Sequence, residues 1–114
     1  MAKDYLATQQ WVEERLGASK MVVDIVAGIL GVGESVTLPY VAGATMAFID
    51  CVYKSGSNLY PGYAVVKNLK SSGTTPIEEK QLCVENQAKY SVSSNGYITF
   101  KTNCLFTYAV TYYA

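Results

Sequence analysis

The sequence predicts a mainly β protein, with an N-terminal helical arm over residues 1–33 and a small antiparallel β-sandwich or barrel over residues 34–114. The arm is indicated by apolar residues at helical spacing in the first third of the chain. The β domain is indicated by short alternating runs, separated by turn residues, from Glu34 onward. The ten tyrosines fit this division, because aromatic residues are common in strands.

The first predicted helix runs from Gln9 to Leu16. Thr8 can cap it by accepting a hydrogen bond from a free backbone N–H, and Gly17 follows at the place where helices commonly end. A helix of about eight residues is not stable alone in water. Its apolar flank is therefore expected to lie against the β domain or a neighbouring subunit.

A second helix is expected after Ser19, since four β-branched residues have the spacing of one helix face. They are Val22, Ile25, Val26 and Ile29. Because β-branched side chains lower helix propensity, a buried strand over Met21 to Val26 is the alternative. Three glycines end the pattern and form a Gly-rich joint with the β domain: Gly28, Gly31 and Gly33.

Strands are expected between turn signals along the rest of the chain. They cover Ser35 to Leu38, Ala44 to Tyr53, Gly62 to Leu69, Tyr90 to Ser93, Tyr97 to Thr102 and Cys104 to Tyr113. Pro39 ends the first of them, and Ser55 to Asn58 forms a turn. Ile77 to Val84 is ambiguous, because Glu78 to Lys80 can form a helical turn whereas Gln81 to Glu85 looks extended.

The hairpin near the C-terminus allows two registers. A three-residue loop over Ser94 to Gly96 pairs apolar residues across the hairpin. The facing pairs are then Val92 with Ile98 and Tyr90 with Phe100. A two-residue Asn-Gly loop would turn apolar side chains to the wrong face, because strands alternate with a period of two. We therefore predict the three-residue loop, with its glycine in the left-handed position.

The last predicted strand has one strongly apolar face, made of Cys104, Phe106, Tyr108, Val110 and Tyr112. A chain end this apolar is expected to be paired or docked. Tyrosine combines a large apolar body with a polar tip and is enriched at protein interfaces. The residues expected at an interface are Trp11, Val12 and Leu16 from the arm, and Tyr108, Tyr112 and Tyr113 from the last strand.

The composition argues against nucleic-acid binding and favours a covered surface. Only 16% of the residues are charged, against about 25% in typical domains. Nine basic and nine acidic residues cancel, and the lysines stand singly, so there is no positive footprint for phosphates. We expect part of this weakly charged surface to be covered in the working protein.

No set of residues suits catalysis, a cofactor or a metal ion. Without histidine, the chain lacks the usual base for a nucleophile and a common metal ligand. The neighbouring carboxylates Glu13-Glu14 and Glu78-Glu79 point in different directions on a helix or strand. Gly28 to Ser35 nearly fits a phosphate-binding loop, but Glu34 stands where the lysine should be. We therefore expect a non-enzymatic protein without a cofactor.

The three cysteines are Cys51, Cys83 and Cys104. Their odd number and wide spacing argue against a disulfide framework and a zinc site, so thiols made in a reducing compartment are expected. No signal peptide is visible, and the most apolar stretch, Met21 to Val32, is too short to cross a bilayer. Asp50, inside an apolar strand, is either an outward-facing residue or a polar contact between subunits.

Two segments resemble fibre and appendage proteins of tailed bacteriophages. Tyr5 to Gly17 is similar to the A-T-[KQ]-x-[YW]-V-[DEN] stretches of those proteins, with matches at Ala7, Thr8, Gln9, Trp11, Val12 and Glu13. Asn95 to Ala114 looks like the closing hairpins of small phage virion domains. The resemblance implies a virion structural protein of head fibre, decoration or adaptor type, attached through its N-terminal arm. It also implies a homotrimer made in the host cytoplasm, contacts with other virion proteins, and a host-surface receptor as a further candidate partner.

Two other functions stay open. A small monomeric ligand- or glycan-binding β domain would have an aromatic-lined pocket, built from Tyr53, Tyr60 and Tyr63. A pilin-like subunit would use Met21 to Leu30 as a packing helix, but it should carry a leader peptide before that helix. The number of copies in solution separates the first two functions, since the virion protein should be a multimer.

Overall fold

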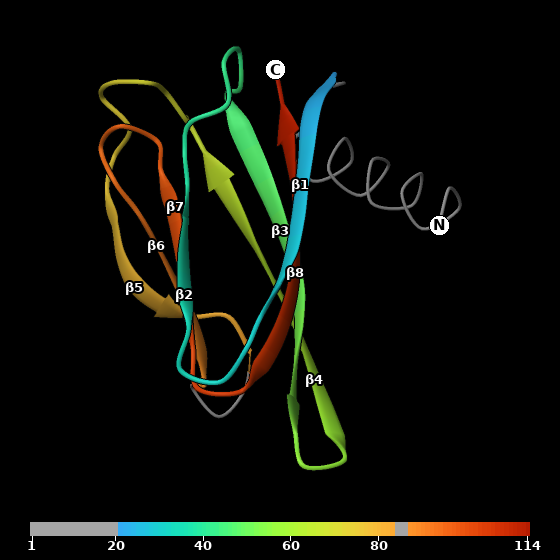
Figure 1. The fold of residues 1–114 in the computed structure, drawn as a ribbon. Helices are drawn as coiled ribbons and strands as arrows, with labels where there is room; N and C mark the ends of the chain where they lie inside the picture. The colour runs from blue at the N-terminus through green and yellow to red at the C-terminus, as the bar shows by residue number, and fades with distance from the viewer. Residues whose placement is uncertain (1–20, 84–86) are drawn as a thin grey trace.

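The computed structural model describes residues 21–83 and 87–114, which form a sandwich of two four-stranded antiparallel sheets (Figure 1). Sheet A contains, in spatial order, β1 (Val22–Leu30), β8 (Leu105–Tyr113), β3 (Met46–Ser55) and β4 (Asn58–Lys67). Sheet B contains, in spatial order, β2 (Ser35–Leu38), β7 (Ile98–Thr102), β6 (Ala88–Val92) and β5 (Ile77–Gln81). The predicted mainly β class is confirmed, and the β domain is a sandwich.

Strands that are distant in the sequence lie side by side in both sheets. β1 pairs with β8, and β2 pairs with β7. In each sheet, a strand from the beginning of the described chain therefore lies beside a strand from its end. The chain passes between the sheets after β1, β2, β4 and β7. Such non-local pairing cannot be read from the local pattern of any one strand.

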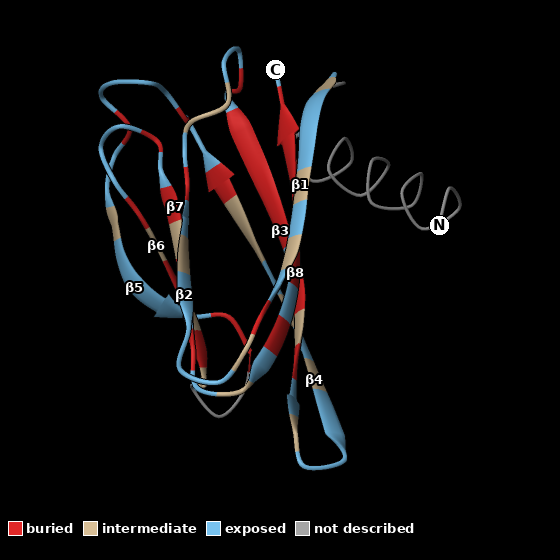
Figure 2. Ribbon diagram, viewed as in Figure 1, coloured by how far each residue is buried: buried red, intermediate tan, exposed pale blue. Residues whose placement is uncertain are grey.

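The hydrophobic core is formed by residues of both sheets, and Figure 2 shows buried segments in strands of each sheet. The predicted alternation of the last strand is confirmed, since Phe106, Tyr108, Val110 and Tyr112 of β8 are all buried. Phe100 of sheet B lies across from β8, with ring centroids 5.6 Å from Phe106 and 4.8 Å from Tyr108. These aromatic contacts join the two layers.

The predicted register of the C-terminal hairpin is also confirmed. In β6 and β7, Val92 lies opposite Ile98 and Tyr90 opposite Phe100. Gly96 has a φ of 76°, the left-handed conformation that a side chain disfavours. A Cβ atom at this position would also lie 2.5 Å from the carbonyl oxygen of Lys70. Both the turn and the neighbouring loop therefore require glycine.

The helix predicted after Ser19 is wrong, because this stretch is strand β1 of sheet A. The four β-branched residues that suggested one helix face are divided between the two sides of the sheet. Val26 packs against the core, whereas Ile25 and Ile29 are exposed. β-branched side chains favour an extended backbone, and the apolar β8 supplies a partner along the whole strand. The other predicted helix, Gln9 to Leu16, lies outside the described residues.

Several strand boundaries differ from the prediction by a few residues. The largest difference is in β4, which begins at Asn58 rather than Gly62 and contains Pro61. Proline is tolerated there because β4 is an edge strand, where one side of the backbone needs no partner in the sheet. β5 is a strand, which resolves the ambiguous segment in favour of the extended form.

Candidate functional site

The outer surface of sheet A is a broad apolar surface, which we call the A face. Cross-strand pairing places its residues in rows. One row contains Ile29, Thr107, Val52 and Pro61, and the next contains Ala27, Ala109, Asp50 and Tyr63. Large apolar side chains are exposed near its margins, with 69% of Ile29 and 65% of Leu59 accessible to solvent. Ile25, Tyr63 and Leu105 are exposed as well.

The centre of the A face is hollowed. A depression of about 370 Å³ lies over β1, β8, β3 and β4. Its lining residues are Ala27, Asp50, Cys51, Val52, Pro61, Thr107, Tyr108 and Ala109. Small outward side chains such as Ala27, Thr107 and Ala109 create the hollow, and the larger Ile29 and Tyr63 stand beside it. The surface therefore combines a recess with protruding apolar groups.

Asp50 is the charged residue that lines this hollow. It faces outward from the middle of β3, next to Ala109 of β8 and Tyr63 of β4. Burial raises the pKa of the Asp50 carboxyl, and a hydrogen bond from the backbone of Cys51 opposes part of this rise. The apolar surroundings thus already disfavour the charged form, and further covering of the A face would strengthen this effect.

One end of the A face is closed by a second hydrophobic cluster. Met46, Phe48 and Tyr113 are buried together on the outer side of sheet A, with Val22 and Val65 packed against them. The rings of Phe48 and Tyr63 are stacked, with centroids 6.1 Å apart. Apolar packing therefore occurs on both sides of β3, which is the pattern of a strand covered on two faces.

The edge of sheet A at β1 is occupied by carboxylates. The Ile25 N–H donates to the Asp24 carboxylate at 2.8 Å, and the Gly31 N–H donates to the Glu34 carboxylate at 2.5 Å. Ile25 lies within β1, and Gly31 directly follows it at the turn towards β2. Side-chain capping of this kind discourages strand addition at a sheet edge. The broad outer face is left as the more open contact surface of sheet A.

The outer surface of sheet B, the B face, has the opposite character. One row across it contains Ser35, Lys101, Lys89 and Gln81, and the next contains Thr37, Thr99 and Ser91. The hydroxyl oxygens of Thr37 and Thr99 are 3.0 Å apart, within hydrogen-bond distance. This face follows the usual alternation, with apolar residues inside and polar residues outside.

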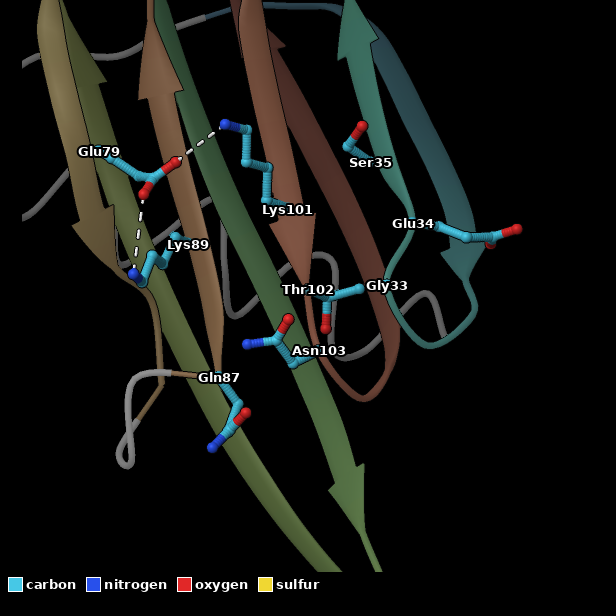
Figure 3. A pocket seen from close by; sticks show the side chains of 9 residues that line it. All are labelled: Gly33, Glu34, Ser35, Glu79, Gln87, Lys89, Lys101, Thr102 and Asn103. Carbon is cyan, nitrogen blue, oxygen red and sulfur yellow. Dashed lines mark ion pairs between the residues drawn. The ribbon is translucent and has the colours of Figure 1, made fainter.

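A polar hollow of about 270 Å³ lies at one end of the B face (Figure 3). Glu79 forms ion pairs there with Lys89 at 3.7 Å and Lys101 at 3.3 Å. The two lysines are thus neutralised in part by a carboxylate within the hollow, which weakens it as an anion site. Among residues 21–83 and 87–114, no group of three or more histidine, cysteine or acidic side chains could hold a metal ion.

The structure places two of the three predicted interface tyrosines in the core between the sheets and the third on the outer side of sheet A. Tyr108 and Tyr112 face the core between the sheets, and burial raises the pKa of the Tyr112 hydroxyl to about 12. Tyr113 belongs to the cluster that closes one end of the A face. Of the six predicted residues, Trp11, Val12 and Leu16 lie outside the described part of the chain.

The aromatic pocket expected for a glycan-binding domain does not form from the predicted residues. Tyr53 is buried in the core and stacks on Tyr60, with ring centroids 4.9 Å apart. Tyr63 lies on the opposite side of sheet A, on its outer face. The phosphate-loop-like segment is likewise divided between β1, the following turn and β2, with no helix after it.

The exposed apolar residues Ile25, Ile29, Leu59 and Leu105 of the A face were not predicted from the sequence as contact residues. Ile25 and Ile29 alternate with inward residues once β1 is read as a strand, so a period of two was the available signal. Leu105 lies on the side of the last strand opposite the predicted apolar face. Which side of a strand is covered depends on the strands that pair with it and on the sheet that packs against it. These partners are distant in the sequence, so a local pattern does not reveal them.

No helix of the described residues is long and apolar enough to cross a membrane. A comparison of the whole chain with known protein families, curated proteins and solved structures found no match. The function is therefore argued from the fold and from its two contrasting outer faces.

Proposed function

We propose that this chain is a non-enzymatic structural protein of a bacteriophage virion, of head fibre, decoration or adaptor type, which associates with copies of itself through the A face. The virion assignment rests on the two sequence resemblances at residues 5–17 and 95–114. The self-association rests on one observation, the exposed apolar outer surface of sheet A. In this proposal residues 1–20, which precede strand β1, attach the protein to other virion proteins.

The A face exposes more large apolar side chains than the B face does. Monomeric proteins rarely expose contiguous apolar patches beyond a few hundred Å². Here exposed apolar side chains are carried by β1, β8 and β4 of one sheet: Ile25, Ile29, Leu105, Leu59 and Tyr63. The B face, built from the same kind of strands, is covered with hydroxyl and charged groups. A β-sandwich therefore does not require this apolar surface, and its presence favours a partner.

The shape of the A face suits a second copy of the same chain. Protruding side chains such as Ile29 stand at a margin, and the hollow of about 370 Å³ lies inward of them. The margin of one copy can fill the hollow of the next, which is a heterologous contact. Such contacts form a closed ring when the rotation between copies closes. We propose a ring of three copies because the resemblance to phage fibre and appendage proteins implies a homotrimer.

The number of copies in solution tests this proposal. Light scattering of the full chain at micromolar concentration should give three times the chain mass of 12.4 kDa. The double variant Ile29→Lys, Leu105→Lys should weaken association by at least about 100-fold, because each buried aliphatic side chain contributes about 1.5–3 kcal/mol. The matched variant Thr37→Lys, Ser91→Lys adds the same charge to the B face and should leave the assembly intact.

A single copy for the unmodified chain, or equal loss of association in both double variants, would refute the role of the A face. The virion assignment has a separate test. Capsid and tail genes should lie beside the gene for this chain, and the protein should be found by mass spectrometry in purified phage particles. A gene neighbourhood without phage structural genes would argue against it while leaving the self-association unaffected.

A further inference from the structure

Two cysteine thiols face each other between the sheets. Cys51 lies in β3 of sheet A, and Cys83 follows β5 of sheet B. Their Sγ atoms are 3.8 Å apart, within hydrogen-bond distance for sulfur, and both residues are buried. The two residues are 32 positions apart in the sequence, so their spacing gave no indication of this contact.

A glycine creates the space that the two thiols share. Gly62 pairs with Cys51 across β3 and β4, and its carbonyl oxygen accepts a hydrogen bond from the Cys51 thiol at 3.3 Å. A Cβ atom on Gly62 would lie 2.8 Å from Cys83 Sγ. Any side chain at this position would therefore push Cys83 away from Cys51. The contact between the two thiols therefore depends on the absence of a side chain at Gly62 and on the hydrogen bond from the Cys51 thiol to its carbonyl oxygen.

We infer that Cys51 and Cys83 are a disulfide-forming pair, whose oxidation by a peroxide ties sheet A covalently to sheet B. A disulfide needs a sulfur separation of about 2.0 Å. Formation of the bond would bring the two Sγ atoms, now 3.8 Å apart, to this separation. The bond would join β3 to the end of β5, two segments that no backbone pairing connects.

The electrostatics of the pair assign the first nucleophile. The hydrogen bond shared with Cys51 lowers the pKa of the Cys83 thiol, although burial opposes this change. The same hydrogen bond, together with burial, raises the pKa of Cys51. Because the thiolate is the reactive form of cysteine, these directions favour Cys83 as the first nucleophile and Cys51 as the second.

The chemistry balances with hydrogen peroxide as the oxidant. The Cys83 sulfur attacks one peroxide oxygen, the O–O bond breaks, and the leaving hydroxide takes the thiol proton to become water. Cys83 is then a sulfenic acid. The Cys51 sulfur attacks the Cys83 sulfur, the S–O bond breaks, and the leaving hydroxide takes the Cys51 proton as a second water. Two thiols lose two electrons, and one peroxide is reduced to two waters.

The test uses the full chain and the variant Cys104→Ser, which keeps only the proposed pair. After treatment with hydrogen peroxide, each protein should become lighter by two hydrogen atoms and lose two alkylatable thiols. Digestion without reductant should yield one peptide pair, linked through Cys51 and Cys83. The unfolding temperature should rise by about 10 °C, since the bond constrains a long loop of the unfolded chain. A reducing dithiol should reverse every change.

The variant Cys51→Ala should keep its remaining thiols free of any intramolecular bond under the same treatment. If this variant does not fold, the peptide map of Cys104→Ser still decides the question. Unlinked sulfinic acids, a bond that involves Cys104, or links only between chains would overturn the inference. These outcomes do not depend on the number of copies in solution, so they are separable from failure of the proposed self-association.

Discussion

The two outer faces of the sandwich are built on strands of the same kind, yet one is apolar and the other polar. β6 and β7 of sheet B alternate between buried and more exposed residues along their length. β3 of sheet A has four buried residues in succession, Met46 to Ile49, because both of its sides are covered there. Such a departure from strict alternation is typical of a strand that is covered on both faces.

The comparison predicts where substitutions should matter. The inner surfaces should be the most sensitive, because the two sheets touch there. The A face should come next, and the B face should tolerate changes. Four substitutions test this order, from the largest expected effect to the smallest.

Gly62→Ala should have the largest effect. The new Cβ atom would lie 2.1 Å from the carbonyl oxygen of Leu82, a backbone atom that cannot move without shifting the chain between the sheets. We expect the free energy of unfolding to fall by about 3 kcal/mol or more, as measured by urea denaturation. Ser57→Ala, in the turn of the same hairpin, should change it by no more than about 0.5 kcal/mol. Equal urea midpoints for the two variants would contradict the close approach.

Phe48→Ala compared with Ser91→Ala tests the two outer faces directly. Phe48 is only 9% exposed although it points away from the core, and it packs with Met46 and Tyr113. Its truncation should cost about 2–3 kcal/mol, near the range of core aromatic residues. Ser91, half-buried on the B face, should cost less than about 0.5 kcal/mol. Comparable losses in the two variants would remove the distinction between the faces.

Asp50→Asn sharpens the comparison through pH. Because burial raises the folded-state pKa of Asp50 above its usual 3.8, the folded protein holds this proton to a higher pH than the unfolded chain does. The contribution of Asp50 to stability is therefore largest below pH 3.8 and is lost as the pH rises through its folded pKa. Urea denaturation from pH 3.5 to 7 (roughly the range of carboxyl titration) should show that the Asn variant gains stability relative to the unmodified protein.

The size of this pH effect should stay below about 1 kcal/mol, since Asp50 is exposed and solvent screens its charge. A pH-independent difference between the two proteins would mean that the apolar surroundings of Asp50 do not act on its carboxyl group.

Glu79→Gln on the B face should have the smallest effect. It removes both ion pairs, with Lys89 and Lys101, but surface pairs of this kind contribute only about 0–1 kcal/mol. We expect a loss of about 0.5 kcal/mol or less in dilute buffer, and none at molar salt. Glu78→Gln makes the same change of charge at the neighbouring position and serves as the control. A loss in Glu79→Gln that persists at high salt would show that the polar hollow stabilises the fold in another way.

The C-terminal half of the fold could be predicted well. The β6–β7 hairpin has the expected register, and β8 has the expected inward face. These features depend on alternation and on a glycine in a tight turn, which are properties of a few adjacent residues. The A face could not be predicted in the same way: Tyr108 and Tyr112, expected at an interface, face the core, and the exposed Ile25, Ile29 and Leu59 were not predicted as contact residues.

The sequence by itself determined the mainly β class, most strand positions and the inward residues of β6, β7 and β8. Only the tertiary structure decided that residues 22–30 are a strand, that Cys51 meets Cys83, and that the outer side of sheet A is apolar. Local periodicity follows from backbone geometry, which neighbouring residues share. Pairing and covering depend on residues far along the chain: β1 becomes a strand because β8, near the other end, lies beside it.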